Sequence, residues 1–301
     1  ATALSACLQR SQSYMRALPG EVSIVSIRDY RLRAIPVLNF LQGFLTRASA
    51  DLAVLMREMG VAEECVLSVE IRCVLLCLYL SYESRLSVES EKAAYRLAVA
   101  TSLLSALPTE LAPVDSDGVC LSALQVAERM RWEAERLQAA LLHEVRVPRG
   151  TAKCGMLSEN VLMMCVFLEL NIPNFIIGKP GTSKSLAKKI IGDAMRGPRS
   201  EARLFRHFKA VTLFSLQCSP HTTSEDIVAV FNKAQAFLQN KSRAAFSACV
   251  VLDEIGLAEN SARMPLKVLH EKLEQPDVGF IGLSNWALDP AKMNRGVFVC
   301  R

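Results

Sequence analysis

The feature that most constrains the fold of this chain is a short run of glycine, proline and small polar residues, Gly178-Lys179-Pro180-Gly181-Thr182-Ser183-Lys184-Ser185. An apolar run precedes it at 174–177, and a helix-forming run follows it at 186–191. In a strand-loop-helix unit of this kind, the N–H groups of the loop and the positive end of the helix dipole point at the same position, just before the first turn of the helix. Because phosphate groups bind at such a place, we expect the loop to cradle a nucleoside triphosphate.

The residues of this loop have expected roles toward a triphosphate. Lys184 can reach the β- and γ-phosphates, and the Ser185 hydroxyl can hold Mg²⁺. The residues expected to contact the nucleotide are Gly178, Pro180, Gly181, Thr182, Ser183, Lys184, Ser185 and Leu186. Ser183 departs from the usual pattern, because glycine normally stands before the lysine; a small side chain should still fit, at a cost in backbone freedom. The alternative is a chance glycine-serine turn after a buried strand.

A second apolar run, about seventy residues further on, ends in two carboxylates. Residues 247–252 are mostly apolar and include adjacent valines, which favours a buried parallel strand over a helix. At the carboxyl end of that strand, Asp253 would bind the Mg²⁺ shell, and Glu254 would orient or activate the attacking water. An acidic strand end is a weak signal alone, but together with the glycine-rich loop it indicates the second half of a nucleotide site.

A third strand is predicted at 278–283, followed by Ser284, Asn285 and Trp286. If this strand neighbours the Asp253 strand, the Asn285 side chain can position water against the γ-phosphate. The alternative is an ordinary asparagine turn signal after a strand.

The remaining elements alternate between strand and helix. A strand is predicted at 210–216 and a helix from about Ser224, where acidic residues suit a helix N-terminus. Pro265 opens a helix on which Leu266, Leu269 and Leu273 recur at helical spacing. This order predicts an α/β fold with three layers around a parallel sheet, and a ligand at the carboxyl ends of the strands.

Composition sets few further limits. The chain has 301 residues, of which 51% are hydrophobic, so it can bury one large or two ordinary cores. Its net charge of +5 is spread out, with no run of five basic residues, so nothing here supports a nucleic-acid partner. The apolar runs at 74–80 and 161–168 are too short to span a bilayer, which predicts no transmembrane segment.

The ten cysteines and four histidines lack the spacing of a zinc site. Cys73 and Cys77 lie one helical turn apart in an apolar run, where we expect small core side chains. Unpaired cysteines in this number suggest a reducing compartment.

Residues 1–147 are predicted to be helical. Leucines at 38, 41, 45, 52 and 55 have helix-compatible spacing, and 121–143 is rich in helix formers. The run Val147-Pro148-Arg149-Gly150 marks the expected boundary with the nucleotide domain, 148–301.

With these residues in place, the chain resembles the AAA+ ATPases. From about Gly155 to Arg301 it closely resembles the mysterin family, giant ubiquitin ligases with a dynein-like AAA+ core. The resemblance is carried by five runs: 158–164 (SENVLMM), 217–220 (QCSP), 252–259 (LDEIGLAE), 264–267 (MPLK) and 284–296 (SNWALDPAKMNRG).

The resemblance implies one of the two AAA+ units of that family that keep a working nucleotide site, using Mg²⁺ and ATP. It implies adjacent AAA+ units of the same long chain and ubiquitin machinery as partners, and a cytoplasmic or lipid-droplet location. Arg28 lies where the sensor arginine of a preceding helical lid would lie. Arg295 is either an arginine finger for a neighbouring unit or a salt-bridged or solvated loop arginine. We expect the chain to be a fragment that stops before its own lid and before the ligase domain.

Two other functions stay open from the sequence. One is a structural module that binds ATP without turnover, and the other is a freestanding remodelling ATPase like midasin or dynein. The intact Glu254 favours turnover, and a zinc-binding ligase domain downstream would favour the mysterin family.

Overall fold

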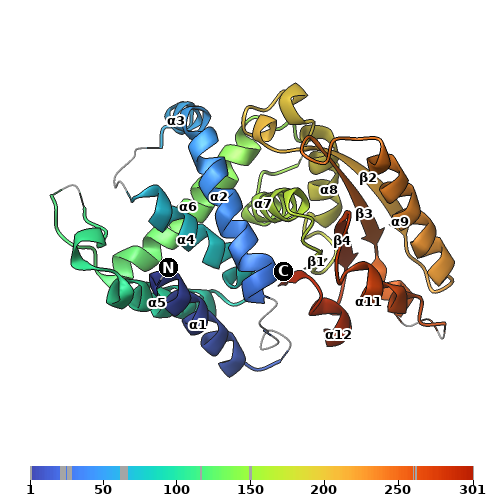
Figure 1. Cartoon of the computed structure of the whole chain (residues 1–301), viewed down its shortest axis with the longest axis horizontal. Helices are drawn as coiled ribbons and strands as arrows, with labels where there is room; N and C mark the ends of the chain where they lie inside the picture. Colours follow the sequence, from blue (N-terminus) through green and yellow to red (C-terminus); the bar gives the residue numbers. More distant parts are fainter. Residues whose placement is uncertain are drawn as a thin grey trace. The chain divides into compact units, whose positions relative to one another are not determined.

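The computed structural model describes residues 2–20, 25, 29–61, 67–115, 117–148, 151–259, 261 and 263–300. The chain forms two compact units, Ala1–Ala140 and Leu141–Arg301 (Figure 1). The division falls within helix α6 (Ala123–His143), a few residues before the boundary predicted at 147 and 148. Past that division, Lys153 Nζ donates to the Leu142 carbonyl at 2.7 Å, a contact within the second unit.

The first unit is built from helices, as predicted. Besides α6 its helices are α1 (Thr2–Ala17), α2 (Ile35–Arg47), α3 (Ser49–Glu58), α4 (Val69–Ser81) and α5 (Glu89–Ala106). Helix α4 begins where the Ser68 hydroxyl accepts the Ile71 N–H at 3.3 Å, which satisfies one of the N-terminal donors. Cys73 and Cys77 are buried on α4, and burial raises their pKa values to about 11 and about 12. They are therefore core side chains.

Buried charges accompany this helical core. Asp29 begins a short π-helix, Asp29–Ala34, and its fully buried carboxylate pairs with Arg33 and Arg85. Such a cluster is stable only when the charges are mutually satisfied. The expected sensor arginine, Arg28, lies outside the described residues.

The second unit has a parallel sheet of five strands. They are β1 (Asn174–Ile177), β2 (Ala210–Gln217), β3 (Phe246–Asp253), β4 (Gly279–Ser284) and β5 (Val297–Cys300). Their order in the sheet is β2-β3-β4-β1-β5, and every pairing is parallel. Strand β4 therefore lies between β1 and β3, which confirms that the Asn285 strand neighbours the Asp253 strand.

Helices cover both faces of this sheet, giving the three predicted layers. Helices α7 (Gly155–Glu169) and α8 (Lys184–Ala194) lie on one side, and α9 (Ser224–Gln239) lies on the other (Figure 1). Helix α9 starts with a capping box, in which Thr223 and Asp226 bond each other's backbone N–H groups. Those hydrogen bonds from Thr223 lower the pKa of Asp226.

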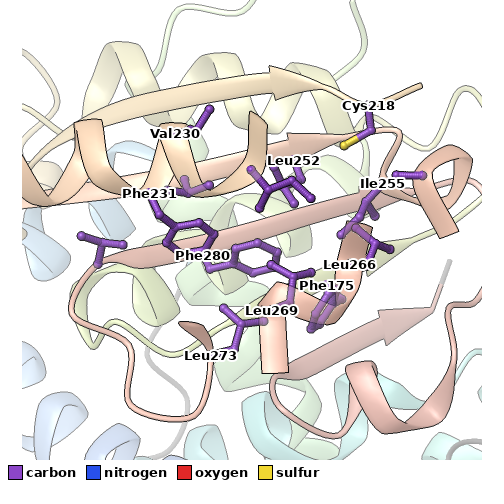
Figure 2. Packing of buried hydrophobic residues seen from close by; sticks show 14 of the residues in the cluster. Phe175, Cys218, Val230, Phe231, Leu252, Ile255, Leu266, Leu269, Leu273 and Phe280 are labelled. Atoms are coloured by element: carbon purple, nitrogen blue, oxygen red, sulfur yellow. The ribbon is translucent and has the colours of Figure 1, made fainter. Parts of the chain in front are cut away.

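Phe280 is central to the core on the α9 side of the sheet. Its ring lies 5.3 Å from that of Phe175 on β1 and 6.1 Å from that of Phe231 on α9, centroid to centroid (Figure 2). Along β3, Val250 and Leu252 belong to this cluster, whereas the buried Val251 between them does not. The strand thus buries both faces, as expected for a central strand between two helical layers.

The helix predicted to open at Pro265 is present, but its first turn is a 3₁₀ turn. After Pro265 the chain makes a single 3₁₀ turn, Pro265–Val268, followed by α11 (Leu269–Lys272). Leu266, Leu269 and Leu273 are nevertheless buried in the core, as their spacing indicated (Figure 2). The helix ends at Lys272, and the N–H of the following Leu273 donates to the Leu269 carbonyl at 3.0 Å.

Among the described residues, no helix has the length and apolarity needed to cross a bilayer.

Candidate nucleotide site

The carboxyl ends of β1, β3 and β4 surround a cavity of about 400 Å³. Most residues predicted for the site line it, although they come from three separate parts of the sequence. The lining residues are Pro180, Gly181, Thr182, Ser183, Lys184, Ser185, Leu186, Asp253, Glu254, Leu283 and Asn285. Since parallel strands end at one edge of the sheet, the fold itself brings the loop, the carboxylates and the asparagine together.

The loop backbone adopts conformations that few residues tolerate. Gly181 has φ 88°, and Ser183 has φ 59° and ψ 19°, which is the left-handed region. The second value explains why glycine is usual before the lysine, since a Cβ in this region is strained. Asn160, fully buried on α7, donates its Nδ2 to the Thr182 carbonyl at 3.0 Å and so holds the strained segment.

Lys184 folds back onto its own loop. Its ammonium donates to the Gly178 carbonyl, to the Lys179 carbonyl at 3.1 Å, and to Asn285 Oδ1 at 3.2 Å. Partial burial lowers the pKa of Lys184, while the nearby carboxylates of Asp253 and Glu254 act in the opposite direction. An anionic ligand in the cavity would therefore find a cation already positioned and partly desolvated.

Two adjacent carboxylates stand at the end of β3. Asp253 Oδ2 accepts a hydrogen bond from Lys188 Nζ at 2.7 Å, and both side chains are mostly buried. Glu254 follows with φ 52°, in the left-handed region, and its side chain is exposed. Strained backbone at a non-glycine residue is frequent at functional sites. This turn lets both carboxylates face the cavity from one strand end.

Trp286 packs against the helix that follows Glu254. A Cβ built on Gly256 would lie 2.7 Å from the Trp286 ring, so only glycine permits this contact. The backbone N–H of Trp286 donates to Ser284 Oγ at 3.3 Å. The segment that carries Asn285 is thereby held against α10 (Ile255–Glu259), which begins directly after Glu254.

Two of the predicted site residues lie outside the cavity lining. Gly178 contributes backbone groups: its N–H donates to the Ser284 carbonyl at 3.0 Å, and its carbonyl accepts from Lys184. Arg295 donates to His270 Nδ1 at 3.1 Å and to the His270 carbonyl at 2.9 Å, and lies 3.6 Å from a Glu274 carboxylate oxygen. Arg295 is thus held within its own unit, in the salt-bridged state that was one of its two interpretations.

Lys188 and Asn160 were not singled out from the sequence. Lys188 stands four residues after Lys184, so helical geometry places both on the same face of α8. The spacing indicates that Lys188 belongs to the site only when α8 is known to pack beside β3. For Asn160 the signal is a polar residue directly before the apolar run at 161–168 of the same helix.

The strain at Ser183 gives a prediction. Ser183→Gly should raise the free energy of unfolding by about 0.5–1 kcal/mol, because glycine removes the left-handed penalty but gains freedom in the unfolded chain. Ser183→Val should lower it, because a β-branched residue tolerates this region worst. Urea unfolding of the three chains measures the difference. Equal stability of the two variants would contradict the strain.

Comparison with known proteins agrees with this geometry. A family model described as "RNF213 AAA domain" matches residues 150–301. E3 ubiquitin-protein ligase RNF213 of Homo sapiens is 39% identical over 97% of this chain, and that of Mus musculus is 37% identical over 98%. The protein rnf213-beta of Danio rerio is 48% identical over 58% of the chain. The human and mouse matches also include the helical unit, which the sequence motifs did not reach.

The chain spans only about 5% of the human protein and 6% of the mouse protein. RNF213 is mysterin, so the resemblance inferred from the five sequence runs is confirmed. The strained glycine-rich loop, the paired carboxylates and the neighbouring asparagine strand lie within the residues that the family model matches. This chain belongs to the RNF213 AAA domain family.

Proposed function

We propose that this chain binds Mg·ATP in the cavity at the carboxyl ends of β1, β3 and β4, and hydrolyses it. The observation that carries the proposal is the convergence of Lys184, Ser185, Asp253, Glu254 and Asn285 on one cavity. Membership of an AAA family supports nucleotide binding in general. The donor set supports the metal, because a hydroxyl and a carboxylate are the hard oxygen ligands that Mg²⁺ prefers.

Each residue has a distinct task in this proposal. Lys184 and the loop N–H groups, from Gly181 onward, bind phosphate oxygens at the N-terminus of α8. Ser185 and Asp253 would hold Mg²⁺, which neutralises charge on the phosphates when bound. Pro180, Thr182, Ser183 and Leu186 shape the wall of the cavity.

Glu254 and Asn285 act on the attacking water. Glu254 accepts a proton from it or orients it, and its exposed carboxylate at the turn after β3 is accessible for that role. Asn285 contacts Lys184 directly, so the asparagine and the phosphate-binding cation share one hydrogen-bonded network. Loss of either water-orienting group should slow turnover more than it weakens binding.

The relatives support a place within a larger ubiquitin ligase. In this proposal hydrolysis drives or locks motion between adjacent AAA+ units, and ubiquitin machinery acts through other parts of the same protein. For Arg295 to act as an arginine finger on a neighbouring unit, its side chain must leave His270 and Glu274 when that unit docks. A cytoplasmic or lipid-droplet location follows from the family resemblance and stays a prediction.

The second candidate is a structural module that binds ATP and retains it unchanged. Hydrogen bonds from Lys184 and Asn160 already order the loop, and an ordered loop suits stable retention of a nucleotide as well as turnover. Measuring ADP formation by the 301-residue chain separates the two. Sustained ADP formation that stops with EDTA supports hydrolysis, whereas one equivalent of ATP recovered intact supports the structural module.

A further inference from the structure

Lys188 is a cation that the proposed reaction does not use. It lies on α8, one helical turn after Lys184, and its ammonium donates to Asp253 Oδ2 at 2.7 Å. The side chains of Lys188 and Asp253 are only 22% and 15% exposed, so solvent screens the pair incompletely. Asp253 is also the carboxylate proposed to hold Mg²⁺.

A lysine and a divalent metal cannot share this carboxylate without cost. Like charges within about 4 Å repel each other near a protein surface, and a doubly charged ion repels an ammonium more strongly than a singly charged one does. The Lys188 ammonium therefore neutralises the Asp253 carboxylate, as Mg²⁺ would when it binds. Lys184 does not duplicate this contact, because its ammonium donates its hydrogen bonds to the loop carbonyls, Thr182 and Asn285.

We propose that Lys188 is a positioning residue that holds Asp253 in the metal-free site and is displaced by Mg²⁺. This inference rests on the proposed function of the cavity. In the metal-free state Lys188 neutralises a carboxylate that would otherwise repel the triphosphate. In the metal-bound state it must release that carboxylate, so the lysine raises the Mg²⁺ concentration that nucleotide binding needs.

The proposal predicts opposite effects of one substitution. In Lys188→Met, metal-free ATP should bind more weakly, because Asp253 is left uncompensated beside the phosphates. The Mg²⁺ concentration for half-maximal binding should fall by about five-fold, the factor that an ion pair of about 1 kcal/mol contributes. Local damage to the site would weaken binding in both conditions and cannot produce opposite signs.

The experiment titrates Mg²⁺ into the 301-residue chain with a fluorescent ATP analogue, and repeats the nucleotide titration in EDTA. Lys188→Arg should restore the wild-type values, since it keeps the cation. Lys189→Met is the matched control, because Lys189 is the exposed neighbour on the same helix and should change neither value. In an Asp253→Asn background, Lys188→Met should no longer shift the Mg²⁺ requirement.

Two outcomes overturn the proposal. An unchanged or higher Mg²⁺ requirement in Lys188→Met would show that the lysine does not compete with the metal. A wild-type chain that is folded and binds no nucleotide in either condition would reject the proposed function, and the role of Lys188 with it. The second outcome is distinguishable because it appears in the wild type before any variant is made.

Discussion

Glu254→Gln should lower the rate of ATP turnover by at least about 100-fold while leaving Mg·ATP binding nearly unchanged. The reason is that glutamine keeps the size of the side chain but cannot accept the proton of the attacking water, and general-base catalysis contributes about 10²–10⁴ in rate. Because Glu254 is exposed and Asp253 carries the contact to Lys188, the substitution leaves the proposed metal ligand in place. Steady-state ADP formation and equilibrium ATP binding, measured on the same preparation, check both parts.

A matched control is Glu271→Gln, which changes an exposed glutamate of α11 that does not line the cavity. It should leave turnover at the wild-type rate. Turnover in Glu254→Gln equal to wild type would remove Glu254 from the mechanism, and Asn285 would then be the next residue to substitute.

Lys184→Ala should weaken Mg·ATP binding by about 100-fold, which corresponds to about 2.7 kcal/mol for charge-assisted hydrogen bonds to the phosphates. The loop should keep its conformation, because Asn160 holds the Thr182 carbonyl from α7 independently of the lysine. Binding is measured by calorimetry, and circular dichroism establishes that the variant is folded.

Lys189→Ala serves as the control for charge, since it removes a cation from the exposed side of the same helix. Its affinity for Mg·ATP should match the wild type. If Lys184→Ala bound as tightly as wild type, the phosphates would not lie at the N-terminus of α8, and the assignment of the loop would be wrong.

The sheet could be predicted from the sequence because its central strands β1, β3 and β4 are buried on both faces and read as short apolar runs. Strand β3 shows this: its apolar run stops at Asp253, and the strand in the structure stops there too. The helix after Pro265 could also be placed, because the spacing of Leu266, Leu269 and Leu273 reports which side chains are buried, but that spacing does not distinguish a 3₁₀ turn from an α-helical one. A 3₁₀ turn followed by one α-helical turn satisfies the same burial.

The site was only partly predictable, for a physical reason. The residues that would contact nucleotide or metal come from motifs whose chemistry is local, such as Lys184 with Ser185 and Asp253 with Glu254. The contacts of Lys188 with Asp253 and of Asn160 with Thr182 depend on how α8 and α7 pack beside the sheet. Sequence spacing along one helix carries no information about that packing.

Calorimetric titration of Mg·ATP into the 301-residue chain tests whether the cavity at the carboxyl ends of β1, β3 and β4 binds the nucleotide. We expect saturable binding of one ATP per chain, weakened in Lys184→Ala and retained in Glu254→Gln. A wild-type chain that is folded by circular dichroism and takes up no ATP in the presence of Mg²⁺ would contradict it.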